Sequence, residues 1–150
     1  MAKQPIAMLT DAQLHGLIDQ RKPEIAALTK SALAKMRKRL PGAAELVYDK
    51  RNSLVIGFCS ADRASNVINS LATYTNWINL FFFEGDALPD PEKLLKGSGS
   101  VVRSIRLTDA AQLDQPAVKA LIAAAAKQAE PPLNPKAKRK IILRQSTRQS

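Results

Sequence analysis

The first forty residues place apolar side chains at the three- and four-residue spacing of helices. Thr10 is suited to cap a first helix that continues to about residue 18. Pro23 stands at a position that opens helices, and Pro41 predicts that the second helix ends at Leu40. An apolar stripe opposite the lysines and arginines of this second helix predicts that it lies on a core, and the stripe consists of Ile25, Leu28, Ala32, Met36 and Leu40.

Short apolar runs after the second helix predict β-strands. Residues 45–49 and 54–59 flank a short polar connection and are typical of a β-hairpin. Residues 64–73 are ambiguous. The run 77–83 is long and rich in aromatic residues, which indicates a strand that is covered on both faces or one whose outer face lines a cleft. Residues 101–108 alternate as a further strand.

Between these last two strands, the sequence has the start and stop signals of a short helix. Asp90 is a suitable N-cap, Pro91 follows at the first helical position, and Glu92 adds a negative charge to the first turn. Lys96 and Gly97 are typical of a helix C-terminus. We therefore expect a compact helix between Asp90 and Gly97.

A capping box formed by Asp109 and Gln112 leads toward a final helix, which is expected to begin near Pro116. The predicted order is two helices, four or five mostly antiparallel strands with one helical insertion, and a last helix. This order predicts an α+β fold with two layers, in which the N-terminal and C-terminal helices pack on a curved sheet.

The chain has 150 residues, of which 45% are hydrophobic, and this is enough for a single core. It contains no apolar run near the roughly 18 residues of a membrane span, and its first residues lack the pattern of a signal peptide. Cys59 is the only cysteine, which fits a reducing compartment and argues against structural zinc. We expect a cytoplasmic protein with no membrane partner and no cofactor, either a monomer or a homodimer.

Positive charge is concentrated near the C-terminus. The net charge is +10, and residues 131–150 supply six basic side chains and no acid. Residues 1–130 contain 17 basic and 13 acidic residues and carry the remaining +4. Because prolines open the last segment and few of its residues are apolar, we interpret 1–130 as one domain and 131–150 as a flexible basic tail. The apolar pair Ile141 and Ile142 leaves open a short strand that docks on a sheet edge.

Two runs of the sequence resemble a known family. The run NLFFFEGDALPDPEKLLKGSGSVVRSIRLTDAAQLDQPAVKALIAAA closely resembles the YdhG-like family of domains of unknown function, in which a strand, a G-x-x-LPDP-x-x-LL-x-G-x-G turn and an R-x-I-R strand follow one another. LVYDKRNSLVIGF is similar to the family's first hairpin, so the resemblance covers about residues 23–127. It implies a curved antiparallel sheet backed by helices, with a shape related to frataxin-like folds, and no agreed activity.

Some members of that family are described as frataxin-like iron chaperones, so the resemblance makes iron a possible cargo. Iron delivery requires clustered oxygen ligands. The only local concentration of carboxylates in the sequence consists of Glu84, Asp86, Asp90 and Glu92. Two of these acids already have helix-end roles, and the single histidine, His15, lies far away in the sequence. We favour structural roles for all four and expect no metal site.

An anion or small-molecule cleft is a second hypothesis. Arg103 interrupts an apolar row on its strand, and a buried guanidinium is costly unless it meets an acid, carbonyl groups or an anionic ligand. The neighbouring strand could supply an apolar wall through Trp77, Asn79, Phe81 and Phe83. In the alternative interpretation, Arg103 reaches the edge or pairs with an acid of the hairpin, and Trp77 belongs to the core.

Catalysis has little support, because no nucleophile, base and orienting acid occur at a convincing spacing. Cys59 lies in an apolar strand and is interpreted as an inert thiol. The glycines of KGSGS, residues 96–100, close a helix and open a strand, unlike a phosphate-binding loop. We therefore expect a non-enzymatic module that binds a small ligand or a protein partner.

Nucleic-acid binding is the third hypothesis. Lysines and arginines gain affinity for phosphates through the release of counterions. The basic tail could provide such contacts, with help from the basic face of the second helix, although a solvated, solubilising tail is the plainer interpretation. The candidate residues are Lys136, Lys138, Arg139, Lys140 and Arg144 of the tail, and Lys35, Arg37, Lys38 and Arg39 of the helix.

Overall fold

The computed structural model describes residues 7–97 and 99–146. The described residues form three α-helices, α1 (Asp11–Ile18), α2 (Pro23–Arg39) and α3 (Pro116–Lys127). Short 3₁₀ turns precede β4, follow β5 and precede α3, and they are η1 (Ala64–Asn66), η2 (Gly85–Ala87) and η3 (Ala110–Asp114). The strands are β1 (Ala7–Met8), β2 (Ala44–Asp49), β3 (Leu54–Cys59), β4 (Val67–Thr73), β5 (Ile78–Phe82), β6 (Arg103–Leu107) and β7 (Ile141–Ser146).

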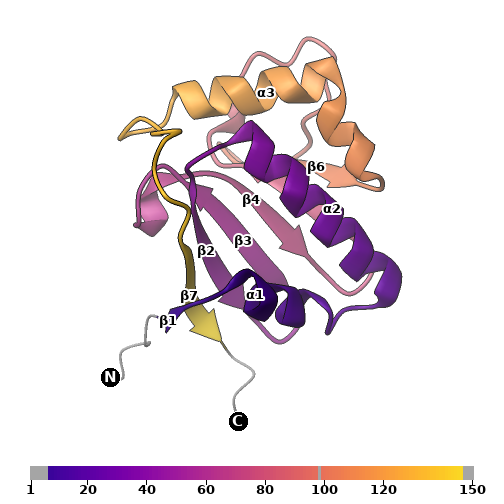
Figure 1. Ribbon diagram of the computed structural model, residues 1–150. Helices are drawn as coiled ribbons and strands as arrows, with labels where there is room; N and C mark the ends of the chain where they lie inside the picture. Colours follow the sequence, from indigo (N-terminus) through magenta and orange to yellow (C-terminus); the bar gives the residue numbers. More distant parts are fainter. Residues whose placement is uncertain (1–6, 98, 147–150) are drawn as a thin grey trace.

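All of these strands belong to one mixed, open sheet with the order β1-β7-β2-β3-β4-β5-β6. Neighbouring strands are antiparallel except β2 and β7, which are parallel. The predicted α+β class is confirmed, whereas the predicted count of four or five strands is wrong, because the described part of the chain has seven. The additional strands are β1 and β7, which come from the two ends of the chain and lie side by side (Figure 1).

The helices lie on one face of the sheet (Figure 1). One core cluster joins the buried side of each helix to the alternate strand positions that face them. Along β3, for example, Leu54, Ile56 and Phe58 belong to this cluster, as expected from the two-residue period of a strand. A small separate cluster lies on the other face and consists of Ala44, Leu46, Cys59 and Ile142.

Local signals place the helix ends as the sequence predicts. The Thr10 hydroxyl accepts from the main chain of Gln13, and the Gln13 side chain accepts from the main chain of Thr10, so α1 begins with a capping box. Pro23 opens α2, and Pro116 opens α3. The ambiguous stretch 64–73 becomes η1 followed by β4.

The short helix predicted between Asp90 and Gly97 does not form. The Asp90 carboxylate accepts from the main-chain N–H groups of Leu94 and Leu95, at 2.9 Å each, and Lys93 has φ 54°. Lys96 then pairs with Ser104 of β6 in both directions, so the chain has already returned to the sheet. A single helical turn gains too little to offset its nucleation cost, and the turn held by Asp90 replaces it.

The interpretation of residues 131–150 as a flexible tail is wrong for residues 141–146. These residues form β7, which lies between β1 and β2, and Ile141 and Ile142 are buried. The two isoleucines occupy opposite faces of the sheet and each meets a hydrophobic cluster there. The sequence left open whether Ile141 and Ile142 belong to a strand that docks on the sheet edge, and the structure shows such a strand. Arg148 of the predicted tail lies outside the described residues.

Among the helices that the structure describes, none combines the length and the apolar character needed to cross a membrane.

Candidate functional site on the uncovered face of the sheet

The face of the sheet opposite the helices has its own pattern of side chains. The strand register places residues from neighbouring strands in rows across this face. One row runs Leu46, Gly57, Ser70, Phe81 and Ser104, and the next runs Tyr48, Val55, Ala72, Asn79 and Arg106. Small residues therefore occupy the middle of both rows, and larger side chains stand on either side.

Gly57 and Ser70 form the floor of a trough on this face. A Cβ at Gly57 would meet Ser70 Oγ at 3.4 Å and Val67 Cγ2 at 3.5 Å, which are ordinary contacts, so the glycine is not required for packing. An isolated glycine within a strand often marks a place where another molecule approaches the backbone closely. The floor of the trough is therefore deeper than it would be with an alanine at position 57, which the packing would accept.

Larger side chains enclose the trough, which has a volume of about 260 Å³. Tyr48 of β2 stands on one side, Phe83 after β5 stands on the other, and both are partly buried. The complete lining is Leu46, Tyr48, Lys50, Val55, Gly57, Cys59, Ala64, Val67, Ser70 and Phe83. Most of these residues are apolar or aromatic, as is typical of pockets that bind small molecules.

The charge near the trough is positive. Lys50 lines it directly and is exposed. Burial raises the pKa of Tyr48, and the positive charge of Arg144 on β7 opposes this rise, which places Arg144 near the same side. The acid nearby is Asp62, which is paired with Lys140 at 2.9 Å. Lys50 and Arg144 therefore place positive charge near a bound group, whereas Asp62 is already paired with Lys140.

Cys59 lies in the floor of the trough and is 1% exposed. Burial raises the pKa of its thiol to about 12. The thiolate is the reactive form of cysteine. The interpretation of Cys59 as an inert, buried thiol is consistent with this environment.

We expect Cys59 to react very slowly with a disulfide reagent such as Ellman's reagent at pH 8, because the folded protein holds the thiol protonated and covered. In a denaturant that unfolds the chain, labelling should become at least 100-fold faster, since an ordinary thiol pKa is about 8.5. The absorbance of the released thiol product measures both rates. Rapid labelling without denaturant would show that the trough floor opens in solution.

A second cluster lies at the other end of β5 from Phe83, where Trp77 and Arg106 line a separate hollow with residues of α2. Trp77 is 40% exposed, and the Arg106 guanidinium lies 5.0 Å from its ring centroid. Arg106 Nε also donates a 2.9 Å hydrogen bond to Asn79 Oδ1. The Trp77 ring contacts Tyr74 on another side, with ring centroids 5.5 Å apart. Arg106 is thus held over the tryptophan by two interactions.

Arg103 does not join this site. It pairs in register with the buried Phe82, so it points to the helix-covered side, whereas Asn79 and Phe81 point to the other. Its Nη1 donates to the carbonyl groups of Gly99 and Val102, at 2.7 and 2.9 Å. Its side chain also covers Gly85, where a Cβ would come within 2.5 Å of Arg103 Cβ. Of the predicted row, the strand register places Asn79 and Phe81 on the uncovered face, where Arg106, and not Arg103, lies beside Asn79.

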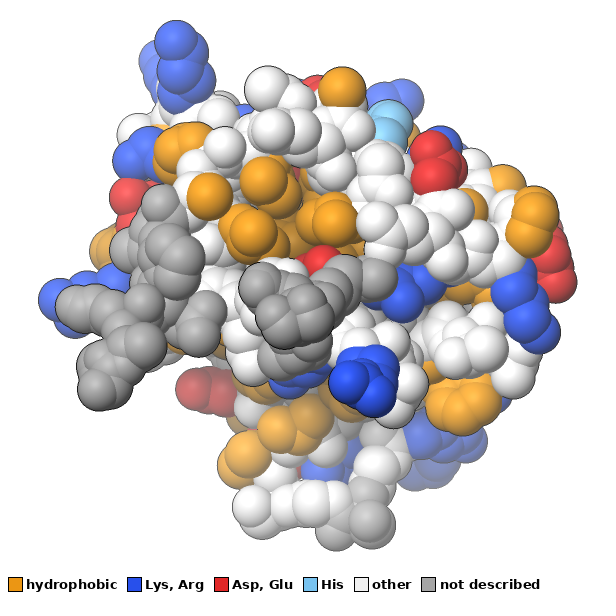
Figure 2. Space-filling view, turned by 90° about the horizontal axis from the view of Figure 1, so that it is seen from below, with side chains coloured by type: hydrophobic (Ala, Val, Ile, Leu, Met, Phe, Trp, Pro, Cys, Tyr) orange, Lys and Arg blue, Asp and Glu red, His pale blue; other side chains and the backbone are white. Residues whose placement is uncertain are grey.

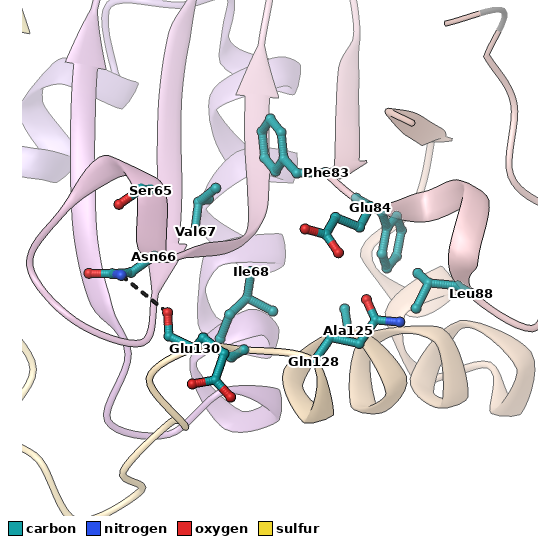
Figure 3. A pocket seen from close by; sticks show the side chains of 12 residues that line it. Ser65, Asn66, Val67, Ile68, Phe83, Glu84, Leu88, Ala125, Gln128 and Glu130 are labelled. Carbon is teal, nitrogen blue, oxygen red and sulfur yellow. Dashed lines mark hydrogen bonds between the residues drawn. The ribbon is translucent and has the colours of Figure 1, made fainter. Parts of the chain in front are cut away.

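Glu84 marks another hollow, of about 430 Å³, between the ends of β4 and β5 and the C-terminal part of α3. Figure 3 shows the Glu84 carboxylate pointing into this space, while the Phe83 ring turns back toward the strands. Asn66 Nδ2 donates a 3.2 Å hydrogen bond to the main-chain oxygen of Glu130 at its rim. Val67 and Phe83 line both this hollow and the trough, so the two are adjacent.

The acids considered for metal binding have separate surroundings. Glu84 faces the hollow, Asp86 is exposed, and Asp90 holds the turn at Leu94 and Leu95. Glu92 is exposed on the same turn. Within residues 7–97 and 99–146, no group of three histidine, cysteine, aspartate or glutamate side chains is placed to hold a metal ion.

The predicted nucleic-acid residues are distributed over several surfaces. Arg139 pairs with Asp11, and Lys140 pairs with Asp62. Lys136 and Lys138 are exposed, whereas Arg144 lies beside Tyr48 and Cys59. On α2, Lys35 and Arg39 pair with Asp114, Arg37 pairs with Asp11 and Glu45, and Lys38 is exposed.

A comparison with protein-family models, with curated proteins and with solved structures finds no match to this chain. The site therefore rests on its own geometry.

Several residues of the trough were missed by sequence reasoning. Gly57 carries a signal that was available, since glycine is unusual in the middle of a strand. Tyr48 and Lys50 belong to the predicted hairpin, but the sequence does not say which face the hairpin leaves uncovered. The contact of Arg106 with Trp77 depends on the strand pairing, which the sequence does not show.

Proposed function

We propose that this chain is a non-enzymatic module that binds a small ligand in the trough on the uncovered face of the sheet. The observation that carries the proposal is the low floor at Gly57 and Ser70 between two aromatic side chains, Tyr48 and Phe83. A Cβ at Gly57 would make only ordinary contacts, yet this position carries no side chain.

The shape and charge of the trough support one class of ligand. Aromatic side chains on two sides favour a flat molecule, because offset and edge contacts between rings stabilise such groups. Lys50 and Arg144 favour a negative group at the side of β2 and β7. A planar aromatic carboxylate or phosphate satisfies both requirements.

Substitution of Gly57 tests this proposal directly. We expect Gly57→Val to weaken the binding of planar aromatic anions by at least 10-fold, because its branched side chain occupies the floor, and Gly57→Ala to have a smaller effect. Gly57→Ala should also raise the free energy of unfolding by about 0.5–1 kcal/mol, since glycine loses the most freedom on folding. A thermal-shift panel followed by calorimetric titration measures affinity and stability in the same samples.

Gly16→Ala is the matched control, because a Cβ at Gly16 meets nothing within 4 Å and the residue lies in α1, on the covered face. It should leave ligand affinity unchanged. Equal affinity of wild-type protein and Gly57→Val for every bound compound would contradict the proposed site.

We also propose that the chain is YdhG-like, with a curved sheet and helices arranged as a second layer. The antiparallel run from β2 to β6 and the position of α2 and α3 on one face support this relation. A cytoplasmic location is proposed with it, supported by the single, unpaired cysteine.

A further inference from the structure

The outer face of β5 presents a row of aromatic rings. Phe81 alternates with the buried residues of β5, so its side chain lies on the uncovered face, and Phe83 lines the trough on that face. Trp77 precedes β5 at the other end of the strand, beside Arg106. The rings of Phe81 and Phe83 are 6.4 Å apart, and Trp77 is 40% exposed. Exposed rings spaced along a sheet are the surfaces on which unpaired nucleic-acid bases stack.

Charge on the strands divides by face. The acids Glu45 and Asp49 face the helices, where they pair with Arg37 and Arg21. On the uncovered face of the described strands, the charged residues are the basic Arg106 of β6 and Arg144 of β7. Lys50, at the turn after β2, adds a third cation. Figure 2, which views the end of the molecule where the termini lie, shows a patch of hydrophobic side chains with basic and acidic side chains around it.

Arg106 is already arranged to meet a phosphate. Trp77 supports one side of its guanidinium, and Asn79 Oδ1 accepts from Nε. Within the described residues, its two terminal nitrogens make no protein hydrogen bond, so they can donate to an anion. The side chain therefore loses little conformational freedom when it binds.

We propose that the uncovered face binds single-stranded nucleic acid. One base enters the trough, neighbouring bases stack on Phe81 and Trp77, and Arg106, Lys50 and Arg144 contact phosphates. This inference rests on the proposed function because the trough supplies the first base site. A duplex keeps its bases paired and cannot use these rings, so the face selects single strands.

Titration of the full chain with a fluorescein-labelled oligodeoxythymidine of about ten nucleotides tests the proposal by fluorescence anisotropy. We expect Trp77→Ala to weaken binding by roughly 5- to 150-fold, the range for the loss of one stacked base. Trp77→Phe should retain most of the affinity. Trp77 is the only tryptophan, so quenching of its fluorescence reports direct stacking in the unlabelled complex.

Salt dependence provides a second measurement. Arg106→Gln should reduce the slope of log K against log salt by about 0.7, the value for one phosphate contact on a single strand. Lys127→Gln removes the same charge from the exposed end of α3 and serves as the matched control. Glu24→Gln should strengthen binding modestly, because Glu24 lines a hollow beside Trp77 and Arg106.

Specific outcomes would overturn the inference. The first is equal affinity for a duplex of the same length. The second is a loss of oligonucleotide affinity in Trp77→Ala and Arg106→Gln that is no larger than the loss in Lys127→Gln. The third is a loss of binding only when Lys136 and Lys138 are replaced. If aromatic anions bind the trough while the oligonucleotide does not bind at 50 mM salt, the inference fails and the proposed function stands. If the oligonucleotide binds through Trp77 and Arg106 in wild type and Gly57→Val alike, base stacking on β5 stands and the trough is rejected.

Discussion

Replacing Arg37 by methionine is expected to lower the free energy of unfolding by about 3–5 kcal/mol, the range for breaking a buried ion pair from one side. Arg37 Nε and Nη2 each donate to a Glu45 carboxylate oxygen at 2.8 Å, and Glu45 is 1% exposed. Without the guanidinium, this carboxylate is left beneath α2 with its charge uncompensated. Chemical denaturation at pH 7 measures the difference.

Lys35→Met is the matched control, because it removes a cation of α2 whose partner, Asp114, is exposed. Its cost should be below about 1 kcal/mol, as for other surface ion pairs. The double variant Arg37→Met with Glu45→Leu should recover most of the loss, since apolar groups can replace a buried pair at little cost. A loss in Arg37→Met no larger than in Lys35→Met would show that Glu45 does not depend on Arg37.

The same arginine gives the stability a pH dependence. Partial burial raises the pKa of Asp11, but the Arg37 hydrogen bond and charge outweigh it and hold the pKa below its ordinary value of 3.8. The ionised Asp11 side chain therefore adds to the free energy of unfolding above about pH 4, and this contribution is lost as the pH falls through its lowered pKa. In Arg37→Met, Asp11 should contribute less to the decrease in the free energy of unfolding at acid pH. Denaturation experiments between pH 2 and 5 measure this difference.

Ending the chain after Ala137 is expected to leave the protein unfolded or barely stable at 25 °C. This truncation removes β7, which pairs with β1 and β2 and buries Ile141 and Ile142. Burial of two isoleucines contributes roughly 3–6 kcal/mol, against a total stability of about 5–15 kcal/mol for an ordinary domain. The unpaired edge of β2 would also favour aggregation.

Ending the chain after Ser146 is the control, because it keeps β7 complete and removes only residues outside the described part. It should leave the melting temperature unchanged. Ile142→Thr tests the same contacts in a full-length chain and should lower the melting temperature by several degrees, as a loss of about 1–2 kcal/mol does for a domain of this size. Truncation after Ala137 with no change in melting temperature would mean that β7 does not stabilise the fold.

Predictions succeeded where the deciding signal was local. Thr10, Pro23 and Pro116 place helix starts through interactions within a few residues. The short helix after Asp90 failed because its signals compete with the bridge between Lys96 and Ser104, which only the folded sheet supplies.

The candidate site was predictable only in part. Alternation along β5 places Asn79, Phe81 and Phe83 on one face from the sequence alone. The choice between Arg103 and Arg106 as their companion depends on which face the helices cover, and an isolated strand pattern does not contain that information.

The sequence by itself determined the three helices, the β2–β3 hairpin, the β5 and β6 strands and the positive charge, because these depend on neighbouring residues and on composition. The tertiary structure alone decided that residues 141–146 insert beside β2, that Gly57 lies at the floor of a trough, and that Arg106 stacks on Trp77. Each of these features joins segments that are far apart in the chain. Their pairing depends on which surfaces become buried in the whole fold, and a local sequence pattern does not contain that information.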